Sequence, residues 1–296
     1  MRYSDGIAFR QALEQRLKTR AGGHEARLVR DRKRVAFDRL LARLAATAPD
    51  RWLLKGGFAL DLRLAERART TKDIDIDWLP AQDELLDTLI EAAERDMGDF
   101  FSFSIERTGP PADRLGGSHR FRILATLAAR QFETFLLDVG FRPESTAQTD
   151  TLKTGDLLSF AGIDPVTVQA IPLELQVAEK LHAYTRIYEN TRSSTRAKDL
   201  IDLALIAELF TLDAATLRIT IKTTFTSRGT HHPPPSLPPP PQDWSIPYRQ
   251  LAQEVGIAED LGAGHSTAAA LLDPVLDDEA THGHWSPAAA HWITRN

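Results

Sequence analysis

The chain has 296 residues, of which 42% are hydrophobic and 26% charged, and this ordinary globular composition excludes a disordered or fibrous protein. It contains no cysteine, which excludes disulfides, thiol nucleophiles and zinc–cysteine sites and is typical of a reducing cytoplasm. The net charge of −5 argues against a general nucleic-acid coat. The charged N-terminus lacks a signal-peptide core, and no apolar run approaches the roughly 18–20 residues of a membrane span. We therefore expect a soluble cytoplasmic protein with no membrane contact.

Residues 1–160 mix helical and strand patterns, which predicts an α/β domain with N-terminal helices. Apolar residues at helical spacing indicate helices over 6–19, 29–47, 58–64 and 81–97. Polar–apolar alternation and β-type composition indicate strands over 73–78, 101–107, 119–126 and 132–139, after a short apolar stretch at 51–54. We expect a mixed sheet in which most strands are antiparallel.

Residues 161–296 are mainly helical in pattern, which predicts a second, helical domain and makes the whole chain α+β. Helical spacing covers residues 173–188, 198–209, 214–225 and 244–255. A proline-rich run at 233–241 predicts an extended loop, which is either a stiff connector or a ligand for a proline-binding module. The last part of the chain shows no pattern that we can assign.

Positive charge gathers near the N-terminus although the chain is acidic overall. Residues 1–47 hold twelve Lys and Arg against five acids, a net of +7, whereas residues 243–296 carry a net of −6. The densest group is Arg30, Arg32, Lys33 and Arg34. Such a segment can attract a polyanion such as RNA. A solvated helix face with scattered arginines is the alternative, and both interpretations stay open.

Three carboxylates, Asp73, Asp75 and Asp77, alternate along the strand at 73–78. Alternation places all three on one face of the strand, about 6.6–7 Å apart. Like charges so placed favour a counter-ion, and Mg²⁺ suits hard oxygen ligands together with substrate phosphates. The alternative is an exposed edge strand whose acids prevent aggregation.

Glycines precede this strand at a helix start. Gly56 and Gly57 lie between a short apolar stretch and a helix, and Gly57 is sixteen residues before Asp73. Glycines there let the backbone approach a phosphate, and the N–H groups of a helix start attract anions. Phosphates on one side and a carboxylate-bound metal on the other are what nucleotidyl transfer requires.

A third strand carries a single acid, Asp138, inside an apolar run. A buried lone carboxylate is costly unless it is paired or bound to a metal. Asp138 is therefore either a third metal ligand or the general base for the attacking hydroxyl. The alternative is that it lies at an exposed strand end and caps a turn at Gly140.

The helical part offers one cation and two acids. Lys180 lies among apolar residues of its helix and is a candidate phosphate-binding group, with a snorkelling surface lysine as the alternative. Asp199 and Asp202 are three residues apart and share one face of the next helix. Helix capping explains one of these two acids but less easily both.

Four of these segments, taken in order, resemble the motifs of a known family, the AbiEii-type toxins. The segments are 55–60, 69–76, 179–181 and 198–203. This family includes the mycobacterial MenT toxins, and its members are nucleotidyltransferases with a polymerase-β-like core. The resemblance, which runs from roughly residue 30 to 255, implies a nucleotidyltransferase domain and a helical C-terminal domain, with a nucleoside triphosphate and Mg²⁺ between them. Some members transfer nucleotides to the 3′ end of tRNA, and a toxin of this kind implies a cognate antitoxin protein.

The resemblance also implies site residues. It places Thr71 and Asp73 at the family's Ser/Thr-x-Asp position, with Asp75 completing Asp-x-Asp. The helical lysine falls on Lys180 and the late aspartate on Asp202, with Asp199 as the alternative. The gap between Gly-Gly and the aspartate pair is longer than in most of the wider superfamily, but it is usual in this toxin branch. The expected catalytic residues are Asp73, Asp75, Lys180 and Asp202, the nucleotide-binding residues are Gly56, Gly57, Thr71 and Lys180, and the metal ligands are Asp73, Asp75 and Asp138.

We therefore expect a Mg²⁺-dependent nucleotidyltransferase toxin that transfers NMP from an NTP to an RNA acceptor, the tRNA 3′ end. Nucleotidyl transfer to a small molecule or to a protein is the alternative within the enzyme class. A non-catalytic partner-binding module on the same fold is the alternative outside it. The presence of Asp73, Asp75 and Lys180 together argues against such a degenerate fold.

Overall fold

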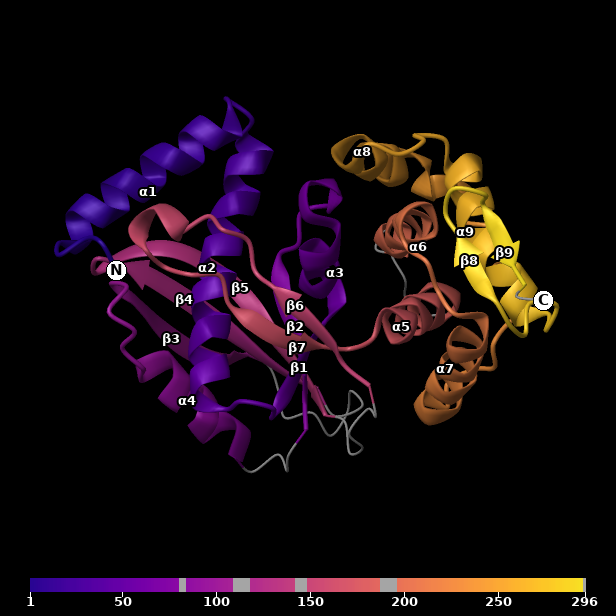
Figure 1. Cartoon of the computed structure of the whole chain (residues 1–296), viewed down its shortest axis with the longest axis horizontal. Helices are drawn as coiled ribbons and strands as arrows, with labels where there is room; N and C mark the ends of the chain where they lie inside the picture. Colours follow the sequence, from indigo (N-terminus) through magenta and orange to yellow (C-terminus); the bar gives the residue numbers. More distant parts are fainter. Residues whose placement is uncertain (80–83, 109–117, 142–147, 187–195, 295–296) are drawn as a thin grey trace. The chain divides into compact units, whose positions relative to one another are not determined.

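The computed structural model describes residues 1–79, 84–108, 118–141, 148–186 and 196–294 (Figure 1). The chain divides into two compact units, Met1–Ile171 and Pro172–Asn296, which we call the first and the second unit. This division falls later than the predicted boundary after residue 160. The reason is strand β7 (Thr167–Ala170), which pairs with two strands of the first unit and keeps the chain in its sheet. No helix in the described part of the chain has the length and apolar character that crossing a bilayer requires.

The helices of the first unit follow the predicted order. They are α1 (Gly6–Ala21), α2 (Glu25–Thr47), α3 (Gly56–Leu64) and α4 (Leu85–Glu94), with 3₁₀ turns at Ala65–Arg67 and Ser159–Ala161. The Asp5 carboxylate accepts hydrogen bonds from the N–H groups of Ile7 and Ala8, which fixes the start of α1. Helix α4 is shorter than predicted because the backbone becomes extended at Arg95. Part of that prediction, residues 81–83, lies outside the described residues.

A seven-stranded mixed sheet organises the first unit. Its strands are β1 (Trp52–Lys55), β2 (Asp73–Trp78), β3 (Phe101–Thr108), β4 (His119–Leu127), β5 (Arg130–Phe141), β6 (Asp150–Lys153) and β7, in the order β3-β4-β5-β2-β1-β7-β6. The β2–β5 and β1–β7 pairs are parallel, and the other four are antiparallel. The predicted mixed, mainly antiparallel sheet is confirmed. Strands β6 and β7 were not predicted, because each has only four residues and one comes to lie beside the distant β1.

One face of the sheet packs against the hydrophobic core, and the other carries polar side chains. Ile74 and Ile76 of β2 are fully buried, and so are Leu137 and Val139 of β5. They belong to the same core as Phe37 of α2, the helix that runs across the sheet in Figure 1. Because side chains alternate along a strand, the residues between these apolar ones point away from the core.

A buried ion network joins α2 to the start of β3. The Arg43 guanidinium is fully buried and donates hydrogen bonds of 2.9 and 2.8 Å to the two oxygens of Asp99. Arg39 donates to Asp99 at 3.4 Å and to Asp38 at 2.8 Å. Asp38 also accepts a hydrogen bond from the Thr154 hydroxyl. Burial raises the pKa of Asp38, and its contacts with Arg39 and Thr154 offset part of that rise.

The second unit is mainly helical, as predicted. It contains α5 (Leu173–Thr185), α6 (Ala197–Leu209), α7 (Ala214–Arg228), α8 (Ser245–Val255) and α9 (Leu261–Leu276), a 3₁₀ turn at Gln242–Trp244, and a hairpin of β8 (His284–Ser286) and β9 (His291–Ile293). Helix α6 is buried along nearly its whole length and packs against α5, α8 and α9. Residues 187–188 of the predicted helix 173–188 lie outside the described residues.

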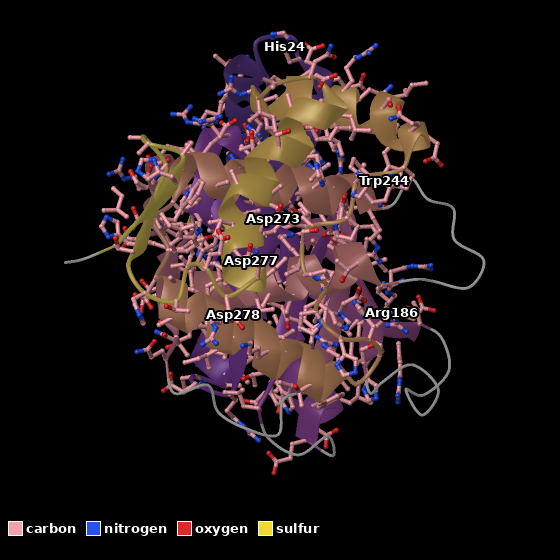
Figure 2. All side chains as sticks on the ribbon, turned by 90° about the vertical axis from the view of Figure 1, so that its right-hand side faces the viewer. His24, Arg186, Trp244, Asp273, Asp277 and Asp278 are labelled. Atoms are coloured by element: carbon pink, nitrogen blue, oxygen red, sulfur yellow. The ribbon has the colours of Figure 1, made fainter. Side chains whose placement is uncertain are left out.

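The proline-rich segment is a connector inside the second unit, between α7 and α8. The Leu237 side chain is buried, and its N–H donates to the Asp273 carboxylate at 2.7 Å. The Tyr184 hydroxyl donates to the carbonyl of Pro238 at 2.7 Å. Asp273 lies on α9, which faces the viewer in Figure 2. These contacts favour the connector interpretation over a segment presented to a proline-binding partner.

Candidate active site

Carboxylates from two neighbouring strands meet on the open face of the sheet. Asp75 of β2 is in register with Asp138 of the parallel strand β5, and Asp73 lies two residues before it. Side chains in register on paired strands point to the same face, about 4.8 Å apart at the backbone. Asp73, Asp75 and Asp138 are all half-buried, whereas the intervening Ile74 and Ile76 are fully buried on the opposite face. The predicted alternation of β2 is therefore confirmed.

The third carboxylate of β2, Asp77, has its counter-ion within the chain. Its side chain is buried, and the Lys55 ammonium lies 2.5 Å from Asp77 Oδ1. Gly140 of β5 is in register with Asp77, and a Cβ there would lie 2.8 Å from Asp77 Oδ1 and 3.0 Å from Lys55 Nζ. The glycine leaves the space that this ion pair fills. We therefore expect substitution of Asp77 to act on folding stability rather than on chemistry.

Gly56 and Gly57 allow β2 to lie against the start of α3. Gly56 adopts a φ of +66°, and a Cβ there would overlap the carboxylate of Asp75. A Cβ on Gly57 would come within 2.6 Å of the Thr71 hydroxyl oxygen. The first N–H groups of a helix and its dipole favour a negative charge at this position. The glycines thus place an acidic side chain and the anion-attracting helix start side by side.

Thr71 positions one of the acids. Its side chain is buried, and its hydroxyl oxygen lies 3.2 Å from Asp73 Oδ1, to which it donates a hydrogen bond. A weaker contact of 3.4 Å reaches the carbonyl oxygen of Asp73. The hydroxyl therefore fixes the orientation of the Asp73 carboxylate, which is consistent with a Thr-x-Asp motif acting as one element.

Asp138 is held by an arginine. Arg120 of β4 is in register with Asp138 and donates to both carboxylate oxygens, at 2.6 and 2.7 Å. Strand β5 continues to Phe141, so the alternative in which Asp138 caps a turn at Gly140 is wrong. The hydrogen bond to Asp138 raises the pKa of Arg120 most strongly, and Asp73 and Asp75 add to this rise. Arg120 therefore lies in the field of all three carboxylates.

These residues fit a magnesium ion that is shared with a substrate. Among the residues that the structure describes, no three acidic or histidine side chains converge as a complete metal cage. Mg²⁺ is usually held by one or two carboxylates together with substrate phosphates, and Asp73 and Asp75 supply such a pair of hard oxygen ligands. Asp138 stays a predicted third ligand, and in that role it has to part from Arg120.

The predicted residues of the second unit form a buried cluster within that unit. Lys180 of α5 is 7% exposed, and its ammonium lies 2.6 Å from Asp202 Oδ2 and 3.8 Å from Asp199 Oδ1, both on α6. The alternative of a snorkelling surface lysine is therefore wrong. Asp199 lies in the first turn of α6 and also accepts a hydrogen bond from Arg196 at 3.0 Å. Asp202 lies deeper in the helix, where Lys180 rather than a helix cap accounts for its burial.

The N-terminal basic group does not form an open RNA surface. Arg30 donates to the carbonyl of Ala68, and Arg34 donates to both oxygens of Asp61 at 2.8 Å. Arg32 pairs with an acid of α1 and stacks on a Phe ring, and Lys33 lies 3.5 Å from an acid of β5. All four are buried or half-buried. The interpretation of Arg30, Arg32, Lys33 and Arg34 as phosphate contacts is not supported, because their charges join α2 to the rest of the first unit.

Two residues of the site escaped the sequence reasoning. Arg120 belongs to a predicted strand, but only the register of β4 on β5 places it against Asp138. Lys55 directly precedes the glycines, and only the pairing of β1 with β2, in which Lys55 lies opposite Asp75, brings its ammonium within reach of Asp77. The polar–apolar alternation of β4 could have indicated Arg120, because it places this residue on the polar face of the sheet.

Comparison with known proteins gives the family and similar folds. The family model described as "Nucleotidyl transferase AbiEii toxin, Type IV TA system" matches residues 39–278. No curated protein matches the chain in sequence. The fold is similar to that of MenT4, a nucleotidyltransferase toxin from Mycobacterium tuberculosis H37Rv, with a TM-score of 0.54 and 20% identity over 95% of this chain and 99% of that one. A putative nucleotidyltransferase from Helicobacter pylori gives a TM-score of 0.50 at 14% identity, over 84% of this chain and 96% of that one.

The chain therefore belongs to the AbiEii family of nucleotidyltransferase toxins, because the family model covers most of its length. A toxin of a type IV toxin–antitoxin system has an antitoxin as its partner. The predicted family and fold class are confirmed.

Proposed function

We propose that the protein transfers a nucleoside monophosphate from an NTP to the 3′ end of an RNA acceptor, with tRNA as the acceptor, and that it does so with Mg²⁺. One observation carries the proposal. Asp73 and Asp75 lie two residues apart on the open sheet face, and Asp75 lies against Gly56 at the start of α3. Carboxylates beside an anion-attracting helix start suit a triphosphate and its cation.

In the proposed reaction the acceptor hydroxyl oxygen attacks the α-phosphorus, its proton is lost, and pyrophosphate leaves. Asp73 and Asp75 would hold Mg²⁺, which when bound would neutralise phosphate charge in the transition state. Thr71 keeps Asp73 in position through its hydroxyl. Gly56 and Gly57 give the phosphates access to backbone N–H groups. Asp138 is the third ligand or the base that takes the hydroxyl proton.

Lys180 and Asp202 enter the proposal through the family motifs. Their burial as a close ion pair supports a dedicated role, because burying two charges is costly unless they are paired or used. Lys180 would bind the triphosphate, and Asp202 would hold the lysine in position. Asp199, at 3.8 Å from Lys180, is the second acid of this cluster and stays the alternative for the late aspartate.

The choice of RNA as acceptor rests on the resemblance to this toxin family. Transfer to a small molecule or to a protein stays the alternative, because the charged groups of α2 are paired within the chain. The cytoplasm is the proposed location, since NTP and tRNA meet there. The cognate antitoxin would suppress the activity.

The test is incubation of the protein with each α-labelled NTP in turn, Mg²⁺ and total tRNA, followed by a denaturing gel. We expect label on tRNA with at least one NTP, and its removal by an exonuclease that acts from the 3′ end. Label on the protein itself or on a small molecule would redirect the proposal to that acceptor. No transfer with any NTP would contradict it.

A further inference from the structure

The open face contains a cation that belongs to the chain itself. The Arg120 guanidinium bridges both oxygens of Asp138, the carboxylate that is in register with Asp75. A bidentate arginine satisfies a carboxylate in the way that a metal does, with positive charge against both oxygens. Asp138 therefore cannot offer these oxygens to a cation while Arg120 stays in place.

The exposure of this ion pair suits exchange. The Arg120 side chain is 55% exposed and that of Asp138 is 22% exposed, whereas Lys55 and Asp77 beside them are 15% and 4% exposed. Exposed ion pairs contribute little net stability, because water replaces each lost contact. Opening the Arg120–Asp138 pair is therefore inexpensive, while opening the Lys55–Asp77 pair would leave a buried charge.

We propose that Arg120 is a positioning residue that holds Asp138 in the absence of a divalent cation and releases it when the cation binds at Asp73 and Asp75. The inference rests on the proposed function, because it requires a cation at those two acids. Once released, the arginine stays on strand β4, next to the strand that bears Asp138, and its guanidinium is available to the negative charge of the incoming triphosphate. The exchange keeps the local charge balanced before and after substrate binding.

Arg122 provides a matched control. It lies two residues further along β4, so it points to the same open face, and its side chain is 58% exposed. Arg122 pairs with the exposed Glu106, at 3.7 Å, which is not an acid of the site. Replacing Arg122 removes the same charge from the same strand face without touching Asp138.

The experiment is a titration of the full chain with Mn²⁺ alone, as a spectroscopic substitute for Mg²⁺, with free Mn²⁺ followed by electron paramagnetic resonance. We expect Arg120→Gln to bind Mn²⁺ about three- to tenfold more tightly than the wild type, because the competitor for Asp138 is gone. Arg122→Gln should stay within about twofold of the wild type, since it contacts no site acid. In the Asp138→Asn background, Arg120→Gln should gain much less affinity.

Unchanged or weaker Mn²⁺ binding by Arg120→Gln would overturn the inference. An equal gain in both backgrounds would also overturn it, because Arg120 would then act only through its general charge. The proposed function is tested separately by Asp73→Asn, which should lose most Mn²⁺ affinity. Full Mn²⁺ affinity in Asp73→Asn would contradict the proposed metal pair, whatever Arg120→Gln shows.

Discussion

Two clusters of Asp and Arg side chains in the first unit form the same kind of ion pair but differ in their exposure to water. In the ion network of α2, Arg43 and Asp99 are enclosed, and Arg43 donates to both oxygens of Asp99. On the open sheet face, Arg120 and Asp138 make an equally short bidentate pair, but the arginine is largely exposed. Residue types and distances alone do not separate the two clusters, whereas access to water does. Buried pairs fix the fold, and exposed pairs can exchange partners at little cost in stability.

The largest stability effect should come from breaking the buried cluster. We expect Arg43→Ala to lower the free energy of unfolding by about 3–5 kcal/mol, because it removes the bidentate partner of the buried Asp99 carboxylate and leaves only the longer contact to Arg39 as an ion pair. Arg122→Ala, on the open face, should change it by less than about 0.5 kcal/mol. Urea denaturation measures both variants. Similar losses for the two would remove the distinction between the clusters.

A second buried pair should behave like the first. Lys180→Met should destabilise the second unit by about 3 kcal/mol, because Asp202 loses a partner at 2.6 Å. The double variant Lys180→Met/Asp202→Leu should recover most of that stability, but no transfer activity. Thermal melting of the three proteins tests this, and an unaltered melting temperature for Lys180→Met would contradict it.

A smaller effect should follow from filling the space next to Asp75. Gly56→Ala places a Cβ against that carboxylate and also forces a φ of +66° on alanine. Gly22→Ala is the control, because its φ is +58° and nothing lies within 4 Å of the added Cβ. Both should lose about 1 kcal/mol from backbone strain. Only Gly56→Ala should also lose transfer activity, by roughly 10²-fold or more, and equal activity in the two variants would show that Asp75 tolerates displacement.

The second unit also contains a partly buried cluster of His and Thr side chains, which we expect to be sensitive to pH. The Thr185 hydroxyl donates to the carbonyl of Leu181, so His231 Nε2 donates to Thr185 at 2.7 Å. His231 Nδ1 then accepts from Thr230 at 2.9 Å, and Thr230 accepts from His182 Nε2 at 2.8 Å. This chain of hydrogen bonds requires a neutral His231, because its Nδ1 accepts a hydrogen bond. Burial lowers the pKa of His182 to about 4 and also lowers that of His231.

A folded-state pKa below the unfolded value of about 6.5 means that the unfolded chain binds more protons in this range. The stability that the folded chain gains by keeping His182 and His231 neutral is therefore complete above pH 6.5, and it is lost as the pH falls towards 4. We expect the melting temperature of the second unit to drop over that window. His182→Phe should flatten the drop, because it removes the imidazole whose pKa burial lowers to about 4. A melting temperature that is constant from pH 7 to pH 4.5 would contradict the neutral arrangement.

The sequence predicted well where a local pattern decides the structure. The alternation of β2 was enough to place Asp73 and Asp75 on one face and the isoleucines on the other. The last helix, α9, was missed because Gly264 and Pro274 interrupt a helical reading. Gly264 is required there, since a Cβ would overlap the ring of Tyr248.

Long-range pairing explains the remaining failures. In the sequence, the charges of α2 resemble a basic surface. In the structure, Arg34 pairs with Asp61 and Lys33 pairs with an acid of β5, both far along the chain. The Arg120–Asp138 contact depends in the same way on strand register. A charged residue can belong to an exposed surface, a structural ion pair or an active site. Which of these applies depends on residues that are distant in the sequence, and a local pattern does not include them.

We propose that the open-face carboxylates Asp73 and Asp75 perform the chemistry, whereas the buried Asp99 of the first unit only holds the fold. This proposal is tested most directly by comparing the wild type with Asp73→Asn for transfer of α-labelled NMP to tRNA, alongside urea denaturation of both proteins. We expect Asp73→Asn to lose roughly 10²–10³-fold or more of the transfer activity, while its free energy of unfolding changes by less than about 0.5 kcal/mol. Transfer at the wild-type rate by Asp73→Asn would contradict the proposed role of the open-face carboxylates.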